Sequence, residues 1–94
     1  MISTHVLDTG KGVPAAGIRV ELFRGEELVA EGETDADGRI PDLADVEPGR
    51  YRLVFHADSP FFKRVEAEVE IEAGRDYHVP LLLSPYACAI YRGS

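Results

Sequence analysis

The chain of 94 residues contains one cysteine, Cys88, and no tryptophan. A single cysteine allows no disulfide within the chain. No stretch approaches the ~20 apolar residues that a membrane-spanning helix needs. The first residues also lack the basic segment and the apolar run of a secretory signal peptide. These absences predict a soluble, cytoplasmic protein without a membrane partner.

Positive charge is scarce as well. Ten Lys and Arg residues stand against 17 Asp and Glu residues, which gives a net charge of −7 and a pI near 4.8. Nucleic acid and anionic membrane surfaces repel such a chain, so we expect neither as a partner. With 45% hydrophobic residues, residues 1–94 are expected to form one domain. A core of this size is marginal alone, and oligomerisation would stabilise it.

Apolar and polar residues alternate in five segments, which predicts strands with one buried face. These segments are residues 2–7, 18–23, 51–56, 65–71 and 77–84. Short stretches rich in Gly, Pro and Asp separate them, and such residues suit tight turns. Strands at this spacing predict an all-β protein of the antiparallel sandwich kind.

His5 and His78 lie within predicted strands near the two ends of the chain. His78 alternates with Tyr77 and Val79, so it lies on the less apolar face of its strand, and His5 lies in the middle of residues 2–7. If these strands pair, the two imidazoles share a face. Imidazole titrates near neutral pH and is able to orient and deprotonate a water molecule. On the residue pattern alone, two strand histidines without a chemical role are the favoured alternative.

Arg39 follows an Asp-Ala-Asp-Gly turn at residues 35–38. Its guanidinium suits a pair of oxygens on a ureide-like ligand, or it is simply a solvated charge. The turn is not a calcium-binding loop, because the twelfth position is Val46 and helices are missing on both sides. Three histidines without close ligand spacing predict no zinc site, and we assign His56 to the surface. Cys88 is expected to be a small buried hydrophobe.

Four segments together resemble the 5-hydroxyisourate hydrolase family, the transthyretin-related enzymes of urate breakdown. They are Ile-Ser-Thr-His-Val-Leu-Asp at residues 2–8, Asp-Ala-Asp-Gly-Arg at 35–39, Tyr-His-Val-Pro-Leu-Leu-Leu-Ser-Pro-Tyr at 77–86 and Tyr-Arg-Gly-Ser at 91–94. The resemblance covers almost the whole chain. It implies a transthyretin (prealbumin)-like antiparallel β-sandwich of about eight strands. It also implies a homotetramer, built as a dimer of dimers, with catalytic sites at the dimer–dimer interface.

The same resemblance implies an activity. The family hydrolyses 5-hydroxyisourate to 2-oxo-4-hydroxy-4-carboxy-5-ureidoimidazoline, and no cofactor or metal is implied. The family's catalytic positions fall here on His5, Arg39 and His78. The substrate-binding positions of its terminal segment fall on Tyr91, Arg92 and Ser94. A frayed terminus is the alternative for those last residues.

The chain departs from the family pattern in three places. Residues 87–90 carry smaller or apolar groups in place of an aromatic and two hydroxyls, and Asp76 replaces a histidine. The connection before Phe61 is short, so we expect the family's helix to be missing. Two other functions stay open, a non-enzymatic prealbumin-like module and an inactive transthyretin fold that binds a hydrophobic ligand. The histidines and the terminal segment favour the enzyme.

Overall fold

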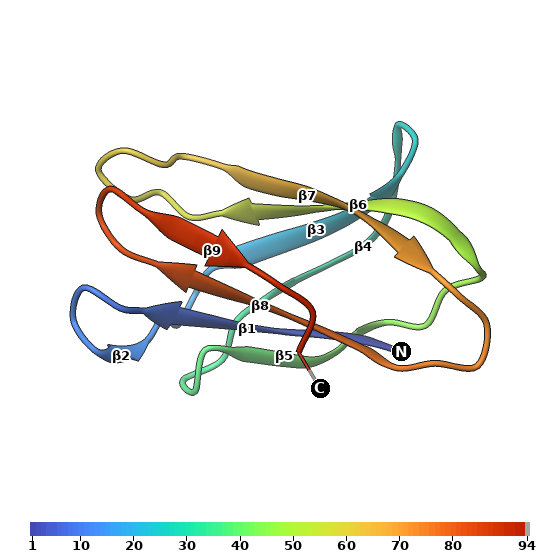
Figure 1. Cartoon of the computed structure of the whole chain (residues 1–94), viewed down its shortest axis with the longest axis horizontal. Helices are drawn as coiled ribbons and strands as arrows, with labels where there is room; N and C mark the ends of the chain where they lie inside the picture. The colour runs from blue at the N-terminus through green and yellow to red at the C-terminus, as the bar shows by residue number, and fades with distance from the viewer. Residues whose placement is uncertain (94) are drawn as a thin grey trace.

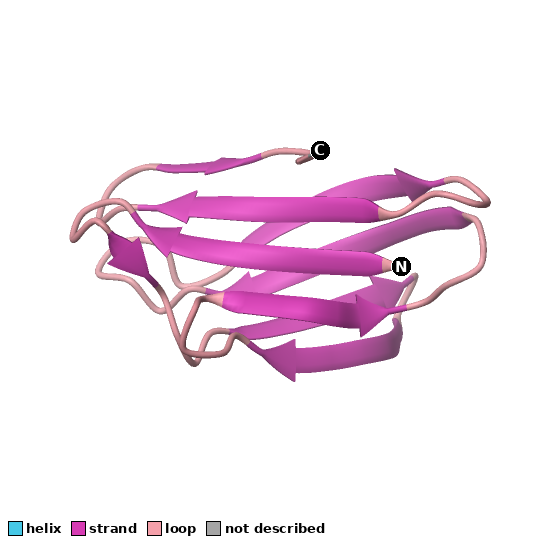
Figure 2. Cartoon of the chain, turned by 90° about the horizontal axis from the view of Figure 1, so that it is seen from below, coloured by secondary structure: helices cyan, strands magenta, loops and turns pink. Residues whose placement is uncertain are grey.

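Two β-sheets face each other in the computed structural model, which describes residues 1–93 (Figure 1). The strands in chain order are β1 (Ile2–Asp8), β2 (Val13–Pro14), β3 (Arg19–Arg24), β4 (Glu27–Glu33), β5 (Arg39–Ala44), β6 (Gly49–His56), β7 (Val65–Ile71), β8 (Tyr77–Leu83) and β9 (Cys88–Ile90). The described part of the chain is built of strands and loops without a helix (Figure 2). It therefore holds no helix long and apolar enough to cross a membrane.

The first sheet has the order β2-β1-β8-β9, and β5 pairs with the same edge of β1 as β2 does. The second sheet has the order β4-β3-β6-β7. All neighbouring strands are antiparallel except β1 and β8, which run parallel. The expected all-β sandwich is confirmed, with this parallel pair as its exception. Residues 1–93 form nine strands where about eight were expected, and one of them is only two residues long.

The core lies between the sheets, because the alternation turns one face of each strand inward. Val6 and Leu81 from the first sheet meet Leu22, Leu53 and Phe55 from the second, and all five side chains are fully buried. Each such side chain contributes roughly 1.5–3 kcal/mol to folding. The inward face therefore fixes which side chains of β1 and β8 point outward.

The connection between β6 and β7, residues 57–64, contains bends but no helix. Ser59 closes it, because its backbone N–H donates to the Phe62 carbonyl and its hydroxyl accepts from the Phe62 N–H, both at 2.9 Å. Phe61 stays exposed and lies against Tyr86, with ring centroids 6.1 Å apart. The loop lies beside Ser84 and Pro85, at the opposite end of β8 from His78.

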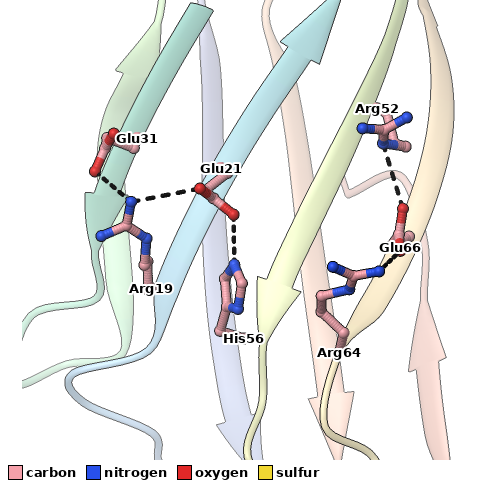
Figure 3. Close-up of polar contacts among 7 residues, drawn as sticks. All are labelled: Arg19, Glu21, Glu31, Arg52, His56, Arg64 and Glu66. Atoms are coloured by element: carbon pink, nitrogen blue, oxygen red, sulfur yellow. Dashed lines mark hydrogen bonds and ion pairs between the residues drawn. The ribbon is translucent and has the colours of Figure 1, made fainter. Parts of the chain in front are cut away.

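Charged side chains cover the outer face of the second sheet (Figure 3). Arg19 contacts Glu31 at 2.7 Å and Glu21 at 3.4 Å, and His56 also hydrogen-bonds to Glu21. The hydrogen bond from His56 is the main cause that lowers the pKa of Glu21, and Arg19 adds to it against the effect of burial. Surface pairs of this kind contribute about 0–1 kcal/mol each. His56 thus lies at the surface, as the sequence predicted.

Candidate active site

The parallel pairing of β1 and β8 brings the two predicted histidines together. Ser3 is the partner of His78 in this ladder, and His5 is the partner of Pro80. The Thr4 side chain points the other way into the core, where its hydroxyl donates to the Val79 carbonyl at 2.7 Å. The imidazoles of His5 and His78 therefore lie on the outer face of one sheet, both half-buried.

The turn before β5 is closed by its own aspartate. The Asp35 carboxylate accepts the backbone N–H groups of Asp37 at 2.9 Å and Arg39 at 3.0 Å, and the Asp35 carbonyl accepts from Gly38 at 2.9 Å. This is the side-chain turn that Asp favours. Arg39 is the first residue of β5 rather than the last residue of the turn.

Two hydrogen bonds hold this turn against β1. His5 Nε2 donates to the Asp37 carbonyl at 2.9 Å, and the Val6 N–H donates to the Gly38 carbonyl at 2.7 Å. Gly38 has a φ of 74°, and a Cβ there would lie only 2.4 Å from the Val6 carbonyl oxygen. Glycine is required on both counts. The close approach makes Arg39 the pairing partner of His5 across the β1–β5 ladder.

The terminal segment continues beside β8 after β9 ends. The Tyr91 N–H donates to the Pro80 carbonyl at 3.3 Å, and the Gly93 N–H donates to the His78 carbonyl at 2.6 Å. The guanidinium of Arg92 lies over the Tyr77 ring, 5.1 Å from its centroid. The described part of the tail is therefore ordered by backbone pairing and is not frayed.

These elements enclose a hollow of about 570 Å³ on the outer face of the first sheet, called here the His78 hollow. Three of the predicted site residues line it, Arg39, His78 and Arg92. Ser3 and Gly93 complete the side next to the imidazole. An imidazole in a hollow that two arginines line suits a ligand rich in carbonyl or anionic oxygens.

The surroundings of His78 favour its neutral form. Burial is the main cause that lowers the pKa of His78, followed by the positive charge of Arg39 and then by His5. The ordinary pKa of histidine is about 6.5. The imidazole is therefore uncharged at pH 7 and has a lone pair with which to accept a proton.

Not every predicted residue lines this hollow. His5 lies beside it as the pairing partner of Arg39 but is not part of its lining. Tyr91 is half-exposed and lines a neighbouring, mainly apolar groove with Val69 and Ile71, which shares Tyr77 and Arg92 with the hollow. Ser94 lies outside the described residues. Cys88 was expected to be buried, but it is exposed, because β9 is an edge strand and turns this side chain toward solvent.

Two residues of the site were missed by sequence reasoning. The Ser3 hydroxyl lies 2.8 Å from Nδ1 of His78. At Gly93, a Cβ would lie 2.8 Å from Cδ2 of His78, so only glycine allows the tail to pass so close to the ring. The signal for Ser3 was present, because it alternates onto the same face as His5. Within residues 1–93, no three His, Cys, Asp or Glu side chains are grouped to hold a metal ion.

Residues 2–93 match the model of the HIUase/Transthyretin family, and the chain belongs to this family. It is similar to the 5-hydroxyisourate hydrolase of Pseudomonas aeruginosa, with 41% identity over 114 residues that cover 99% of this chain and 90% of that protein. A probable 5-hydroxyisourate hydrolase of Schizosaccharomyces pombe is 38% identical over 112 residues, with the same two coverages of 99% and 90%.

Solved structures agree with this assignment. The 5-hydroxyisourate hydrolase of Klebsiella pneumoniae has a TM-score of 0.89 and 35% identity, and the match covers 99% of this chain and 98% of that chain. A crystal structure of (S)-allantoin synthase has a TM-score of 0.84 and 31% identity, and 43% of that chain is covered. The transthyretin-like sandwich inferred from the sequence is confirmed.

The protonation of His78 is directly testable by NMR titration of its ring. We expect a midpoint below about pH 6.5 in the parent protein. Arg39→Gln removes one of the charges that disfavour the imidazolium, so the His78 midpoint should move upward. Arg50→Gln, in the other sheet, is the matched control and should leave the midpoint unchanged. An unchanged midpoint in the Arg39 variant would show that the two side chains do not interact.

Proposed function

We propose that this protein hydrolyses 5-hydroxyisourate to 2-oxo-4-hydroxy-4-carboxy-5-ureidoimidazoline, as part of urate breakdown in the cytoplasm. The observation that carries the proposal is the His78 hollow, which His78, Arg39 and Arg92 line and beside which His5 pairs with Arg39. Family membership supports it, since relatives named 5-hydroxyisourate hydrolase share 36–41% identity over 99% or more of this chain.

The reaction requires water to attack a ring amide. In our proposal, His78 takes a proton from the water as its oxygen bonds to the carbonyl carbon. Arg39 and Arg92 stabilise the negative charge that develops on the carbonyl oxygen. The C–N bond of the ring then breaks, and the imidazolium of His78 returns the proton to the departing nitrogen. His5 helps to hold the water.

The lowered pKa of His78 suits both of these steps. The neutral imidazole is already present at pH 7, so it can act as the base without first losing a proton. Once protonated, the imidazolium beside Arg39 is a stronger acid than ordinary histidine and gives its proton up readily. Tyr91 and Ser94 are proposed to contact the substrate on the basis of the family resemblance alone.

The catalytic proposal is tested by producing 5-hydroxyisourate in situ from urate and following its decay with and without the protein. His78→Ala and His5→Ala should each lower kcat by about 100-fold or more, which is the usual contribution of a general acid–base group. Both side chains point away from the core, so circular dichroism should show an intact fold. His56→Ala, in the other sheet, is the control and should retain activity. Unchanged turnover in either active-site variant would remove that residue from the mechanism.

The protein is further proposed to assemble as a homotetramer, a dimer of dimers. The hollow lies on the outer face of a sheet, and a second copy laid over that face would exclude water from it. Light scattering at micromolar concentration should therefore give the mass of four chains. A monomer under these conditions would contradict the proposed assembly.

The terminal segment provides a further test. Deleting residues 91–94 removes two backbone hydrogen bonds to β8 and the half-exposed Tyr91 ring, so the loss of stability should be modest, about 1–3 kcal/mol. Activity should fall much more, by about 100-fold or beyond, because Arg92 would no longer hold the substrate. Arg92→Gln keeps the backbone pairing and separates the effect of the charge from that of the chain. Full activity after truncation would reduce the tail to a packing element.

A further inference from the structure

Ser3 faces His78 directly across the parallel ladder of β1 and β8, with its Oγ 2.8 Å from Nδ1 of the ring. We propose that Ser3 is a positioning residue for the proposed hydrolysis. Its hydroxyl fixes the orientation of the His78 imidazole and holds the proton of the neutral ring on Nδ1. This inference rests on the proposed function for its effect on turnover, but its effect on the ring can be measured without substrate.

The imidazole of His78 is held at two neighbouring positions. Ser3 contacts Nδ1 on one side of the ring, and Gly93 lies so close to Cδ2 on the other that a Cβ would approach to 2.8 Å. Both Nδ1 and Cδ2 are bonded to the first ring carbon, Cγ. The two contacts therefore involve the ring atoms nearest the backbone, and they leave the outer edge, Cε1 and Nε2, free to face the hollow. Turning the ring over would place Cδ2 against the Ser3 oxygen, and the hydrogen bond would be lost.

The position of the proton on the neutral His78 ring depends on the direction of this hydrogen bond, because a hydroxyl can both donate and accept. If the Ser3 hydroxyl donates to Nδ1, the neutral ring carries its proton on Nε2 and has no lone pair there for water. If Nδ1–H donates to the Ser3 oxygen, the lone pair is on Nε2. Only the second arrangement gives His78 a base on its outer edge.

The same hydrogen bond also serves the protonated ring. An imidazolium has N–H groups on both nitrogens, and Nδ1–H keeps donating to the Ser3 oxygen after Nε2 has taken the proton. No rearrangement at Ser3 is then needed between the two steps of the reaction. Burial and the charge of Arg39 oppose the imidazolium, so a hydrogen bond that remains in place limits that cost.

The two histidines are held through opposite nitrogens. His5 uses Nε2 to donate to the Asp37 carbonyl, which leaves Nδ1 as the acceptor of its neutral ring. His78 uses Nδ1 toward Ser3, which leaves Nε2. The free lone pair of His5 is thus on Nδ1, near the backbone, whereas that of His78 is on Nε2, at the tip of the ring. His78 is therefore better suited to reach a water in the hollow.

Ring-nitrogen NMR of the uniformly labelled full chain tests the inference above the titration midpoint of His78. In the parent, the neutral ring should show Nδ1 protonated and Nε2 unprotonated. Ser3→Ala should give a mixture of the two tautomers, whereas Ser3→Thr keeps a hydroxyl and should restore the parent pattern. Ser84→Ala is the matched control, because that serine donates its hydroxyl to Ala87 beyond the far end of β8.

Kinetics provide the second readout. Ser3→Ala should lower kcat by about tenfold to hundredfold with little change in KM, the size of effect known for the partners that orient metal-bound histidines. Ser3→Thr should recover most of the loss, and Ser84→Ala should show none. Ser3→Ala with parental kcat and a parental tautomer would overturn the inference. So would a parent ring protonated mainly on Nε2, a result that needs no variant to fold. If the parent fails to hydrolyse 5-hydroxyisourate, the proposed function fails while the NMR result still decides the role of Ser3.

Discussion

The parallel register of β1 and β8 is the constraint on which the candidate site depends. It pairs Ser3 with His78 and leaves His5 two positions further along the same face. Alternate side chains of β1, including Ile2 and Val6, are fully buried, so the register is held by the core rather than by the site. A slip of one residue would turn His5 and Ser3 inward and expose these apolar residues. The free energy of core packing therefore keeps the histidines in place.

A second constraint places positive charge next to them. The Asp35 carboxylate shapes the turn, and the absence of a side chain at Gly38 lets that turn approach β1 closely enough for hydrogen bonding. Arg39 begins a strand directly beside His5 as a result. The chain carries a net charge of −7, but this corner gathers two guanidinium groups and an imidazole. Burial and then the positive charge of Arg39, rather than the overall charge of the chain, lower the pKa of His78.

The sequence predicted those strands in which apolar and polar residues alternate with a period of two. The alternation indicated β1, β3, β6, β7 and β8, and it put His5 and His78 on outward faces. It missed β4, whose Leu28 and Val29 are exposed and break the pattern, although Gly25 in the two-residue connection before it is a hairpin signal. It also missed β5, where Pro41 argued against a strand and is tolerated because only one side of β5 is paired.

Contacts between distant segments were harder to predict. Alternation tells which face a side chain occupies, but it does not tell which strand lies alongside. The pairing of Ser3 with His78, the neighbouring groove for Tyr91 and the exposure of Cys88 all depend on strand order. For the same reason, the family resemblance supplied candidate residues without the hydrogen bonds that orient them.

The departures from the family pattern lie mostly away from the His78 hollow. The shortened connection at residues 57–64 and the altered residues 87–90 contribute no side chain to its lining. Asp76 does line it, but its carboxylate is exposed and faces the Met1 amine at 3.5 Å, an amine that it shares with Asp45. Three residues keep the shape of the hollow. Gly38 and Gly93 allow the backbone to approach β1 and His78 closely, and Ser3 orients the His78 ring. Loops can therefore shorten in this chain while the geometry around His78 is preserved.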